Sequence, residues 1–305
     1  MKRKRNPVKP SAGAAPEVEP KLSAYADVLI KAALFEDIGP GDITTKATVP
    51  PAMTGVCKII AKEDIVVAGL FVAQKTFGQL DNSADFRCLC KDGDAVKKGR
   101  TIAMVTGALG ALLTAERVAV NFLQRMSGVA TLTREFVAKT RGTKARILDT
   151  RKTTPCMRML ERYAVRAGGG SNHRFGLFDC ILIKDNHIKA AGGVKKAVEA
   201  VYKKYHEVVP VEVEVTNFKE VKEAVAGGAD IIMLDNMPVA RIKKALRIID
   251  SRAFVEVSGG INLSNVRAVA KTGVDFISVG ALTHSARAVD ISMEVVSYES
   301  SGRRG

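Results

Sequence analysis

Short apolar, β-branched runs alternate with helical stretches in the second half of the chain, an alternation typical of βαβ units. We predict helices over residues 217–226 and 263–272, because Gly227-Gly228 and Gly273 follow them as stop signals. Six clear strands are predicted, at residues 145–150, 180–184, 209–215, 230–234, 253–257 and 275–279. A short extra strand between residues 164 and 174 would make seven. We therefore predict a β/α barrel of about six to seven parallel strands.

The first half of the chain mixes helical and strand-like periods. A helical stretch at residues 22–35 runs into the turn-rich segment 36–42, where Gly and Pro oppose a continued helix, and a loop follows. Residues 55–68 and 84–106 carry β-formers, with Lys91-Asp92-Gly93-Asp94 as a hairpin-type turn. We therefore predict a small domain with mixed strands.

A turn and a helix complete the prediction for this half. The turn at residues 92–99 resembles the hammerhead turns of biotinyl and lipoyl carrier domains but lacks their modified lysine, so we interpret it as structural. The helical period from 112 to 139 has Thr114 as a candidate N-cap, and Arg117, Asn121 and Gln124 form a polar stripe that its pattern alone assigns to solvent. We expect an N-terminal α/β open-sandwich, hammerhead-like domain.

These patterns predict three parts of the chain. Residues 1–20 are a disordered basic tail, which opens with Lys2-Arg3-Lys4-Arg5 and has no apolar core of a secretory signal. Residues 21–130 form the N-terminal α/β domain, which residues 286–305 rejoin. Residues 131–285 form the β/α barrel, which we expect to be the catalytic domain.

The formal net charge of +15 fits nucleic acid, an anionic membrane surface or an anionic small molecule as partner. With 5% aromatic residues and no tryptophan, the chain lacks the stacking surfaces of single-strand binders. No apolar run approaches the roughly 18 residues of a membrane-spanning helix. We expect no nucleic-acid or membrane partner. Five cysteines without a repeated C-x-x-C predict a reducing, cytoplasmic compartment.

Polar residues cluster where the predicted barrel strands end. Parallel strands bring their carboxyl ends to one mouth, so these residues should share a pocket. Four cations converge there with His173, and like charges repel unless an anion neutralises them, which predicts a multiply anionic ligand. The strand-end segments are Asp149-Thr150-Arg151-Lys152, Lys184-Asp185-Asn186-His187, Glu214, Asp235-Asn236, Ser258-Gly259-Gly260 and Gly280, and His173-Arg174 precede the second strand.

Two carboxylates and two glycine turns belong to the same mouth. Glu214 and Asp235 could neutralise a cation, bind ribose hydroxyls, hold a magnesium ion or pair with neighbouring lysines. The Ser258-Gly259-Gly260 and Gly280-Ala281 turns follow the last two strands, where barrels commonly bind a phosphate through backbone N–H groups and a helix N-terminus.

The order of these motifs, from about residue 25 to 295, resembles the quinolinate phosphoribosyltransferase family. The resemblance implies a decarboxylating pentosyltransferase of NAD biosynthesis that joins quinolinate to 5-phosphoribosyl 1-diphosphate with magnesium. It also implies a homodimer in which Arg117 is donated by the neighbouring subunit. The motifs are Glu36-Asp37-Ile38-Gly39-Pro40-Gly41-Asp42, Glu116-Arg117, Asn121-Phe122, residues 148–155, Asn172-His173-Arg174, Gly176-Leu177, residues 183–187, Glu212-Val213-Glu214, Leu234-Asp235-Asn236, Ser258-Gly259-Gly260 and Val279-Gly280-Ala281.

The same resemblance implies a role for each site residue. Those around the quinolinate carboxylates are Arg117, Arg151, His173, Arg174 and Lys184; those for the ribosyl diphosphate and its metal are Lys152, Glu214 and Asp235; those for the 5-phosphate are Ser258, Gly259, Gly260, Gly280 and His284. Thr150, Val279 and Ala281 complete the predicted substrate site. Lys152, Lys184, Glu214 and Asp235 are the predicted catalytic residues, with Glu214 and Asp235 as metal ligands.

Electrostatics agrees with that assignment. Planar Arg forks match carboxylates bidentately, so the arginine set favours a dicarboxylate over nicotinate, which would leave one arginine unpaired. Loss of the ring carboxylate leaves a carbanion that the cationic ring nitrogen stabilises, so we expect no dedicated base.

Other functions remain open at this point. Lys184 or Lys152 could be the Schiff-base nucleophile of an aldolase, which borohydride would trap. A nucleic-acid-binding protein would retain DNA in a salt-sensitive way without turnover. A paralogue of the same fold could act on another anionic heterocycle, including one associated with molybdenum transport genes.

Overall fold

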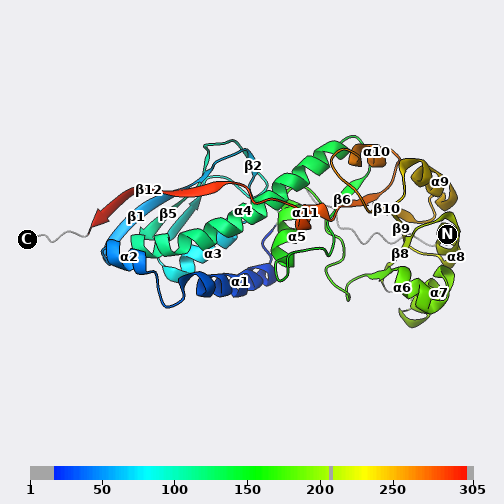
Figure 1. Cartoon of the computed structure of the whole chain (residues 1–305), viewed down its shortest axis with the longest axis horizontal. Coiled ribbons are helices and arrows are strands. Elements are labelled where there is room, and N and C mark those ends of the chain that lie inside the picture. Colours follow the sequence, from blue (N-terminus) through cyan, green and yellow to red (C-terminus); the bar gives the residue numbers. More distant parts are fainter. Residues whose placement is uncertain (1–16, 206–208, 301–305) are drawn as a thin grey trace, which may run out of the picture. The chain divides into compact units, whose positions relative to one another are not determined.

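The computed structural model describes residues 17–205 and 209–300, which fall into two compact units (Figure 1). The barrel unit comprises residues 133–153 and 170–285, and the sheet unit comprises residues 17–132, 154–169 and 286–300. Residues 154–169 lie inside the predicted barrel domain but make their contacts in the sheet unit. The predicted tail falls largely on residues 1–16, outside the described residues, and a helix begins at Pro20.

Six parallel strands form the sheet of the barrel unit, in the order β6-β11-β10-β9-β8-β7 (Figure 1). They are β6 (Arg146–Leu148), β7 (Ile181–Ile183), β8 (Val211–Val215), β9 (Ile231–Asp235), β10 (Phe254–Ser258) and β11 (Phe276–Ser278). Each clear predicted strand is present, and the β/α-barrel prediction is confirmed. The strands are buried along almost their whole length, which explains their continuous β-branched sequences.

Helices connect these strands, and local signals fix their ends. They are α6 (Asp185–Ala191), α7 (Val194–Tyr205), α8 (Phe218–Gly227), α9 (Val239–Ile249), α10 (Val266–Ala270) and α11 (Ala281–His284). Asn217 caps α8 by accepting a hydrogen bond from the Glu220 N–H, and Gly228 ends it at φ 79°. The predicted helix at 263–272 is shorter than expected, since α10 covers only five residues.

The extra strand predicted between residues 164 and 174 is wrong. The strongly amphipathic helix α5 (Arg158–Ala167) takes up residues 164–167, and residues 168–174 form a turn and an irregular stretch instead of a strand. Only Ser171 makes an isolated parallel bridge to Leu148 of β6.

The sheet unit is built on a four-stranded antiparallel sheet in the order β12-β1-β5-β3, with a two-stranded ribbon of β2 and β4 beside it. Its elements are α1 (Pro20–Ile38), α2 (Ile43–Thr48), β1 (Met53–Ala61), β2 (Ile65–Val66), α3 (Leu70–Leu80), β3 (Asp85–Cys88), β4 (Ala95–Val96), β5 (Thr101–Ala108), α4 (Leu109–Thr140) and β12 (Ile291–Ser300). Apolar residues of α3 and α4 form one core cluster with those of the sheet. This is the open α/β arrangement predicted.

Two local predictions in this unit are wrong, and one helix was missed. A short helix, α2, replaces the expected loop because Asp42 caps it through the Thr45 N–H. The helix α3 was not predicted. Thr114 is not an N-cap, because α4 begins at Leu109 and the Thr114 hydroxyl bonds instead to the carbonyl of Gly110.

Two buried carboxylates tie the segments of the sheet unit together. Asp92, in the predicted hairpin-type turn, accepts hydrogen bonds from the N–H groups of Gly69 and Leu70 and from the Tyr163 hydroxyl at 2.7 Å. Glu161 on α5, whose side chain is 0% exposed, pairs with Arg125 of α4 at 2.5 Å. The segment 154–169 therefore belongs to this unit through specific polar contacts as well as packing.

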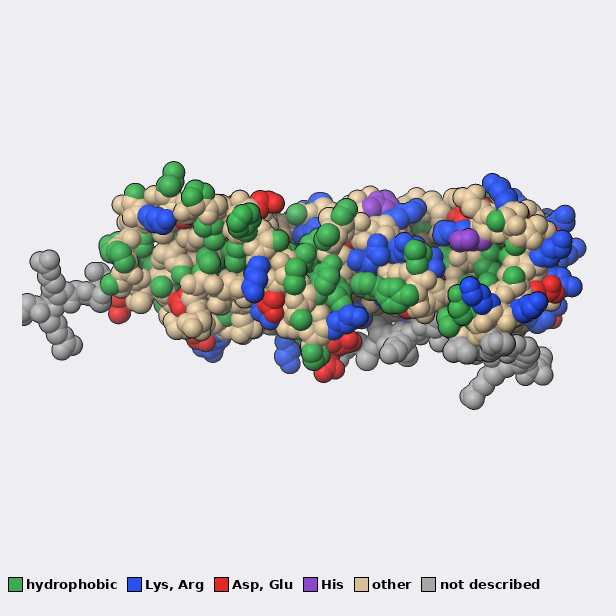
Figure 2. All heavy atoms as spheres, turned by 90° about the horizontal axis from the view of Figure 1, so that it is seen from below, with side chains coloured by type: hydrophobic (Ala, Val, Ile, Leu, Met, Phe, Trp, Pro, Cys, Tyr) green, Lys and Arg blue, Asp and Glu red, His purple; other side chains and the backbone are tan. Residues whose placement is uncertain are grey.

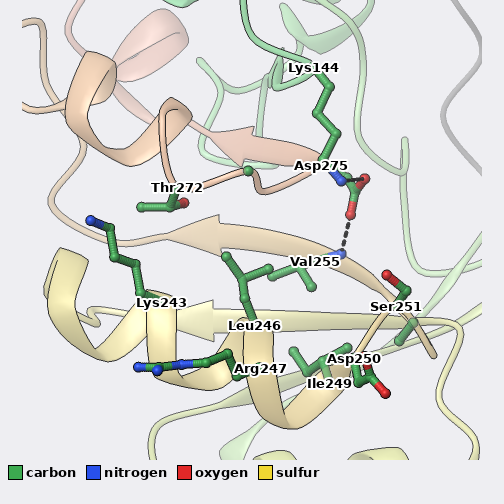
Figure 3. Close-up of a pocket in the computed structure, with 12 residues that line it drawn as sticks. Lys144, Lys243, Leu246, Arg247, Ile249, Asp250, Ser251, Val255, Thr272 and Asp275 are labelled. Atoms are coloured by element: carbon green, nitrogen blue, oxygen red, sulfur yellow. Dashed lines mark hydrogen bonds and ion pairs between the residues drawn. The ribbon is translucent and has the colours of Figure 1, made fainter.

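The barrel unit has a hollow of about 440 Å³ at the amino ends of its strands (Figure 3). Asp275 accepts hydrogen bonds there from the Val255 N–H at 2.9 Å and from Lys144 Nζ at 2.7 Å. Asp250 lines the hollow at the end of α9 in a left-handed conformation. Catalytic residues in β/α barrels lie at the opposite, carboxyl ends of the strands. We therefore interpret the hollow at the amino ends as structural.

Two further observations concern cysteines and membranes. All five cysteines are free, and Cys88 and Cys156 are exposed. Among the described residues, no helix combines the length and apolarity that crossing a membrane would need.

Candidate active site

A cavity of about 740 Å³ opens at the carboxyl ends of the barrel strands. It brings together fourteen of the sixteen predicted substrate-site residues: Thr150, Arg151, Lys152, His173, Arg174, Lys184, Glu214, Asp235, Ser258, Gly259, Gly260, Gly280, Ala281 and His284. Val279 is not among them, because it is only 1% exposed and its N–H bonds to the Leu148 carbonyl. Arg117 belongs to the sheet unit, where it is exposed on α4.

The cavity is strongly cationic, and Lys and Arg side chains gather over the barrel unit (Figure 2). Arg151, Lys152, Arg174 and Lys184 all line it. Burial, followed by the charge of Arg151, lowers the pKa of Arg174. Burial is the larger cause, and the repulsion from Arg151 adds to it; a bound polyanion would relieve that repulsion.

The carboxylates Glu214 and Asp235 end neighbouring strands, β8 and β9. Glu214 Oε2 lies 2.6 Å from Lys184 Nζ, and Asp235 Oδ2 accepts a hydrogen bond from Asn236 Nδ2 at 2.8 Å. The sequence left several roles open for this pair. In the structure Glu214 pairs with a neighbouring lysine, Lys184.

Glycine residues in the turns after β10 and β11 line the cavity and present backbone without side chains to it. Gly259 and Gly260 have φ of 88° and 63°, a region that L side chains rarely adopt. At Gly280 an added Cβ would lie 3.1 Å from the His284 ring and 3.3 Å from Lys152 Cδ. The expected helix N-terminus after Gly280 is weak, since α11 has only four residues. Any anion held there would therefore depend on the turns and on Lys152.

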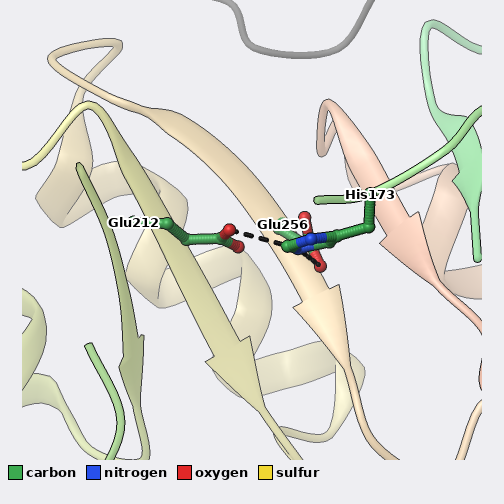
Figure 4. Close-up of side chains that lie close together, drawn as sticks. All are labelled: His173, Glu212 and Glu256. Atoms are coloured by element: carbon green, nitrogen blue, oxygen red, sulfur yellow. Dashed lines mark ion pairs between the residues drawn. The ribbon is translucent and has the colours of Figure 1, made fainter. Parts of the chain in front are cut away.

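His173 lies between two buried glutamates in the barrel interior (Figure 4). Its Nε2 is 3.1 Å from Glu212 Oε2 and 3.5 Å from Glu256 Oε1, and its Nδ1 accepts a hydrogen bond from the Arg174 N–H at 2.7 Å. Ser278 donates to Glu256. Both ring nitrogens of His173 are therefore engaged by the protein itself.

The protonation of this cluster follows from its geometry. Burial opposes a charged imidazole, but Glu256 and Glu212 outweigh it and raise the pKa of His173 well above its usual range. Burial and then the charge of Glu256 raise the pKa of Glu212 to about 7. The two glutamates therefore favour a hydrogen on Nε2, which lies toward both of them, while Nδ1 accepts the hydrogen bond from the Arg174 N–H.

The three residues also have the composition of a metal site, with ligand atoms within 4.8 Å of one another. A metal would need the lone pair of Nε2. Because Nδ1 accepts a hydrogen bond, a neutral ring carries its hydrogen on Nε2. The geometry is therefore that of a hydrogen-bonded cluster rather than a metal centre.

Sequence reasoning missed several residues of this site. The cavity is also lined by Leu182, Met233, Ile261 and Ser278, and the buried Glu256 contacts His173, which lines it. Asn236 lines the cavity as its strand end predicted, and Glu212 was named within a motif, but neither was given a role. Two signals could have found the glutamates. Glu212 shares the strand face of Glu214 by the two-residue period, and Glu256 interrupts an apolar strand.

Asp149 was noted in the sequence but given no role. Its side chain is 0% exposed and accepts hydrogen bonds from Asn172 Nδ2 at 2.6 Å and from the His173 N–H at 2.7 Å. It therefore holds the backbone that presents His173 and Arg174 to the cavity.

Fold and cavity together define a β/α-barrel protein with a strongly cationic cavity at the carboxyl ends of its strands. Two family models match the chain: quinolinate phosphoribosyl transferase, N-terminal domain, over residues 42–127, and the C-terminal domain of the same family over residues 129–294. The chain belongs to the quinolinate phosphoribosyltransferase family.

Individual relatives agree. The chain is 44% identical over 261 residues to a probable nicotinate-nucleotide pyrophosphorylase [carboxylating] of Bacillus subtilis, covering 86% of this chain and 90% of that protein. It resembles the nicotinate-nucleotide pyrophosphorylase structure from Francisella tularensis with a TM-score of 0.86 and 42% identity, over 90% of this chain and 96% of that one. The NadC structure from Streptococcus pyogenes gives a TM-score of 0.88 at 40% identity, over 93% and 99%.

Proposed function

We propose that this chain is a decarboxylating quinolinate phosphoribosyltransferase, a pentosyltransferase of NAD biosynthesis. It converts quinolinate and 5-phosphoribosyl 1-diphosphate to nicotinate mononucleotide, pyrophosphate and carbon dioxide. The observation that carries the proposal is the single cationic cavity in which an arginine-rich wall meets a wall of lysine, carboxylates and glycine turns. Membership of the family and the names of the relatives support it.

The arginine-rich wall is proposed to bind quinolinate through Arg151, Arg174 and Lys184. Planar guanidinium forks suit two adjacent ring carboxylates. His173 belongs to the same wall, but both its ring nitrogens are engaged, so we propose that it contacts the ligand through its ring rather than through a nitrogen hydrogen bond.

The opposite wall is proposed to bind the ribosyl diphosphate. Lys152 would face the diphosphate, and the 5-phosphate would rest on Ser258, Gly259, Gly260, Gly280 and His284, with Thr150 and Ala281 beside them. The exposed backbone of the glycine turns supports this, because a Cβ would obstruct close approach of phosphate oxygens.

Glu214 and Asp235 are the proposed magnesium ligands. The donor set fits, since Mg²⁺ prefers carboxylate oxygens combined with substrate phosphates and water. The two side chains end adjacent strands inside the cavity. A bound Mg²⁺ would neutralise negative charge on the diphosphate, and Lys184 would be free to turn from Glu214 to the substrate.

Catalysis is proposed to be mainly electrostatic. As the ribose C1–diphosphate bond breaks and the quinolinate nitrogen bonds to C1, positive charge develops on the ribose and negative charge on the leaving group. Glu214, Asp235 and Lys152 all line the cavity, and we propose that the two carboxylates would face the positive charge and Lys152 the negative charge. The C–CO₂ bond then breaks, its electron pair stays on the ring beside the cationic nitrogen, and a proton from water completes the product. We propose no dedicated base for this step.

A homodimer is proposed as the working form, with Arg117 completing the neighbour's cavity. Arg117 and Asn121 are exposed on α4, and so are large apolar side chains elsewhere in the sheet unit: Phe35 is 83% exposed and Ile43 81%. Burying these apolar side chains against a second subunit would be favourable. A cytoplasmic location is also proposed, supported by five free cysteines.

The deciding experiment incubates the protein with quinolinate, phosphoribosyl diphosphate and Mg²⁺ and measures nicotinate mononucleotide and carbon dioxide. Nicotinate replaces quinolinate in a parallel reaction. We expect product only in the reaction that contains quinolinate, because nicotinate would leave an arginine of the site unpaired. Absence of product, or equal use of nicotinate, would refute the proposal. Borohydride trapping at Lys184 or Lys152 would instead support the aldolase alternative.

A further inference from the structure

Asn236, directly after β9, has a left-handed backbone conformation, which glycine adopts more readily than asparagine. Its φ is 53°, in the left-handed region. Four non-glycine residues among the described ranges have positive φ, namely Cys156, Asn236, Asp250 and Ser251, and of these Asn236 alone lines the mouth cavity. Strained backbone in such a place is a reason to ask what the residue does.

The turn itself does not need an asparagine. The Asn236 N–H extends the β9–β10 ladder by bonding to the Ser258 carbonyl at 2.9 Å, and the left-handed turn then returns Met237 to the core, where it is 7% exposed. Glycine would follow the same path with less strain. The side-chain amide therefore calls for a separate explanation.

That amide lies between two parts of the proposed ribosyl diphosphate wall. Asn236 Nδ2 donates to Asp235 Oδ2 at 2.8 Å. On the other side, a Cβ built on Gly259 would lie 2.3 Å from Asn236 Oδ1, so the amide occupies the space that the missing side chain leaves. One side chain thus contacts both the Asp235 carboxylate and the Gly259-Gly260 turn.

We propose that Asn236 is a positioning residue that orients the Asp235 carboxylate and sets the Gly259-Gly260 turn for the ribosyl diphosphate. This rests on the proposed function of the cavity. The amide holds one carboxylate oxygen, Oδ2, and would leave Oδ1 to bind the ligand. It acts on the ribosyl diphosphate side only, because neither of its contacts reaches Arg151 or Arg174.

Three variants separate positioning from a role in the turn alone. Asn236→Gly keeps the left-handed turn and removes the amide. Asn236→Asp keeps the shape but puts a second carboxylate against Asp235 in place of the N–H donor. Asp250→Gly is the matched control, since Asp250 has a φ of 47° at the end of α9, in the hollow at the opposite strand ends.

Steady-state kinetics with each substrate varied in turn, together with melting temperatures, give the test. For Asn236→Gly we expect the KM for phosphoribosyl diphosphate to rise about tenfold, as for other groups that orient a ligand residue, with the melting temperature unchanged. The KM for quinolinate should change by less than about twofold, because its wall is untouched. Asn236→Asp should be worse than Asn236→Gly, and Asp250→Gly should match the unmodified protein.

The outcomes are distinguishable from failure of the proposed function. If the unmodified protein makes no nicotinate mononucleotide, the function is wrong whatever the variants do. If it turns over and Asn236→Gly or Asn236→Asp keeps its KM for phosphoribosyl diphosphate, the positioning role is wrong. An equal rise in both KM values, or a lowered melting temperature for Asn236→Gly, would also overturn it, because either shows a role in the fold alone.

Discussion

Replacing Glu161 by alanine should destabilise the sheet unit strongly although the residue lies outside the catalytic cavity. The Glu161 side chain is 0% exposed and accepts hydrogen bonds from Arg125 Nη2 at 2.5 Å, Arg125 Nε at 3.1 Å, the Thr154 N–H at 3.1 Å and Thr154 Oγ1 at 2.8 Å. The substitution removes the acceptor for all of these donors at once.

The magnitude follows from what remains. Breaking a buried ion pair costs about 3–5 kcal/mol, because the other charge is left behind. Arg125 is 26% exposed and keeps its hydrogen bond to the Ala286 carbonyl at 2.7 Å, so part of its charge stays solvated. We therefore expect the low end of that range, about 3 kcal/mol. Glu161→Gln keeps an oxygen acceptor and should cost about 1–2 kcal/mol.

Urea unfolding followed by circular dichroism measures the loss. With a slope of about 2 kcal/mol per molar urea, Glu161→Ala should lower the midpoint by about 1.5 M. Glu199→Ala is the control, since Glu199 forms a 3.6 Å pair with Lys195 that is more than half exposed and worth about 0.3–0.5 kcal/mol. Equal losses for the two variants would refute the reasoning that burial, not pairing, sets the cost.

Three further predictions concern the site, the assembly and pH. Arg151→Lys should raise the KM for quinolinate about tenfold, because an ammonium cannot form the bidentate contact; an unchanged KM in steady-state assays would contradict this. Arg117→Ala and Lys152→Ala should each be inactive alone, yet mixing them should restore activity if one subunit completes the cavity of the other; no recovery after subunit exchange would argue against a shared site. Burial raises the pKa of Asp92, so the native state binds the proton of this carboxyl group more tightly than the unfolded chain does. The resulting contribution to stability is complete below pH 3.8, the value for the unfolded chain, and is lost as pH rises through the raised pKa. Asp92→Asn should therefore flatten the pH dependence of the unfolding free energy above pH 3.8, and a parallel curve would exclude Asp92 as its source.

The barrel was predictable because its strands are buried on both faces and so carry β-branched runs that no surface helix would have. The cationic mouth followed from it, since strand ends in a barrel share one rim. The segment after residue 154 was harder. It was assigned to the barrel domain, with part of an extra strand, whereas its Glu161 binds Arg125 of the sheet unit, more than thirty positions earlier in the sequence.

The features that were missed depend on contacts between residues far apart in the sequence or on backbone conformation, which the local pattern does not show. Thr114 has the chemistry of an N-cap, but the helix starts earlier because the apolar period extends back to Leu109 and packs in the core. The left-handed turn at Asn236 leaves no pattern in the sequence. Glu256 could be noticed as a carboxylate in an apolar strand, but its partner His173 comes from a segment without regular structure.

The engagement of both His173 ring nitrogens matters for inhibitor design. A pyridine analogue given an extra hydrogen-bond donor or acceptor to reach the imidazole would meet only carbon-bound hydrogens or the ring face. To form a hydrogen bond with a ring nitrogen, it would have to break the contact of His173 with Arg174 or with the glutamates. Affinity should instead come from geometry that satisfies Arg151 and Arg174 together. Selectivity among anionic heterocycles would then be decided by the angle between two carboxylates rather than by hydrogen bonding at the floor of the cavity.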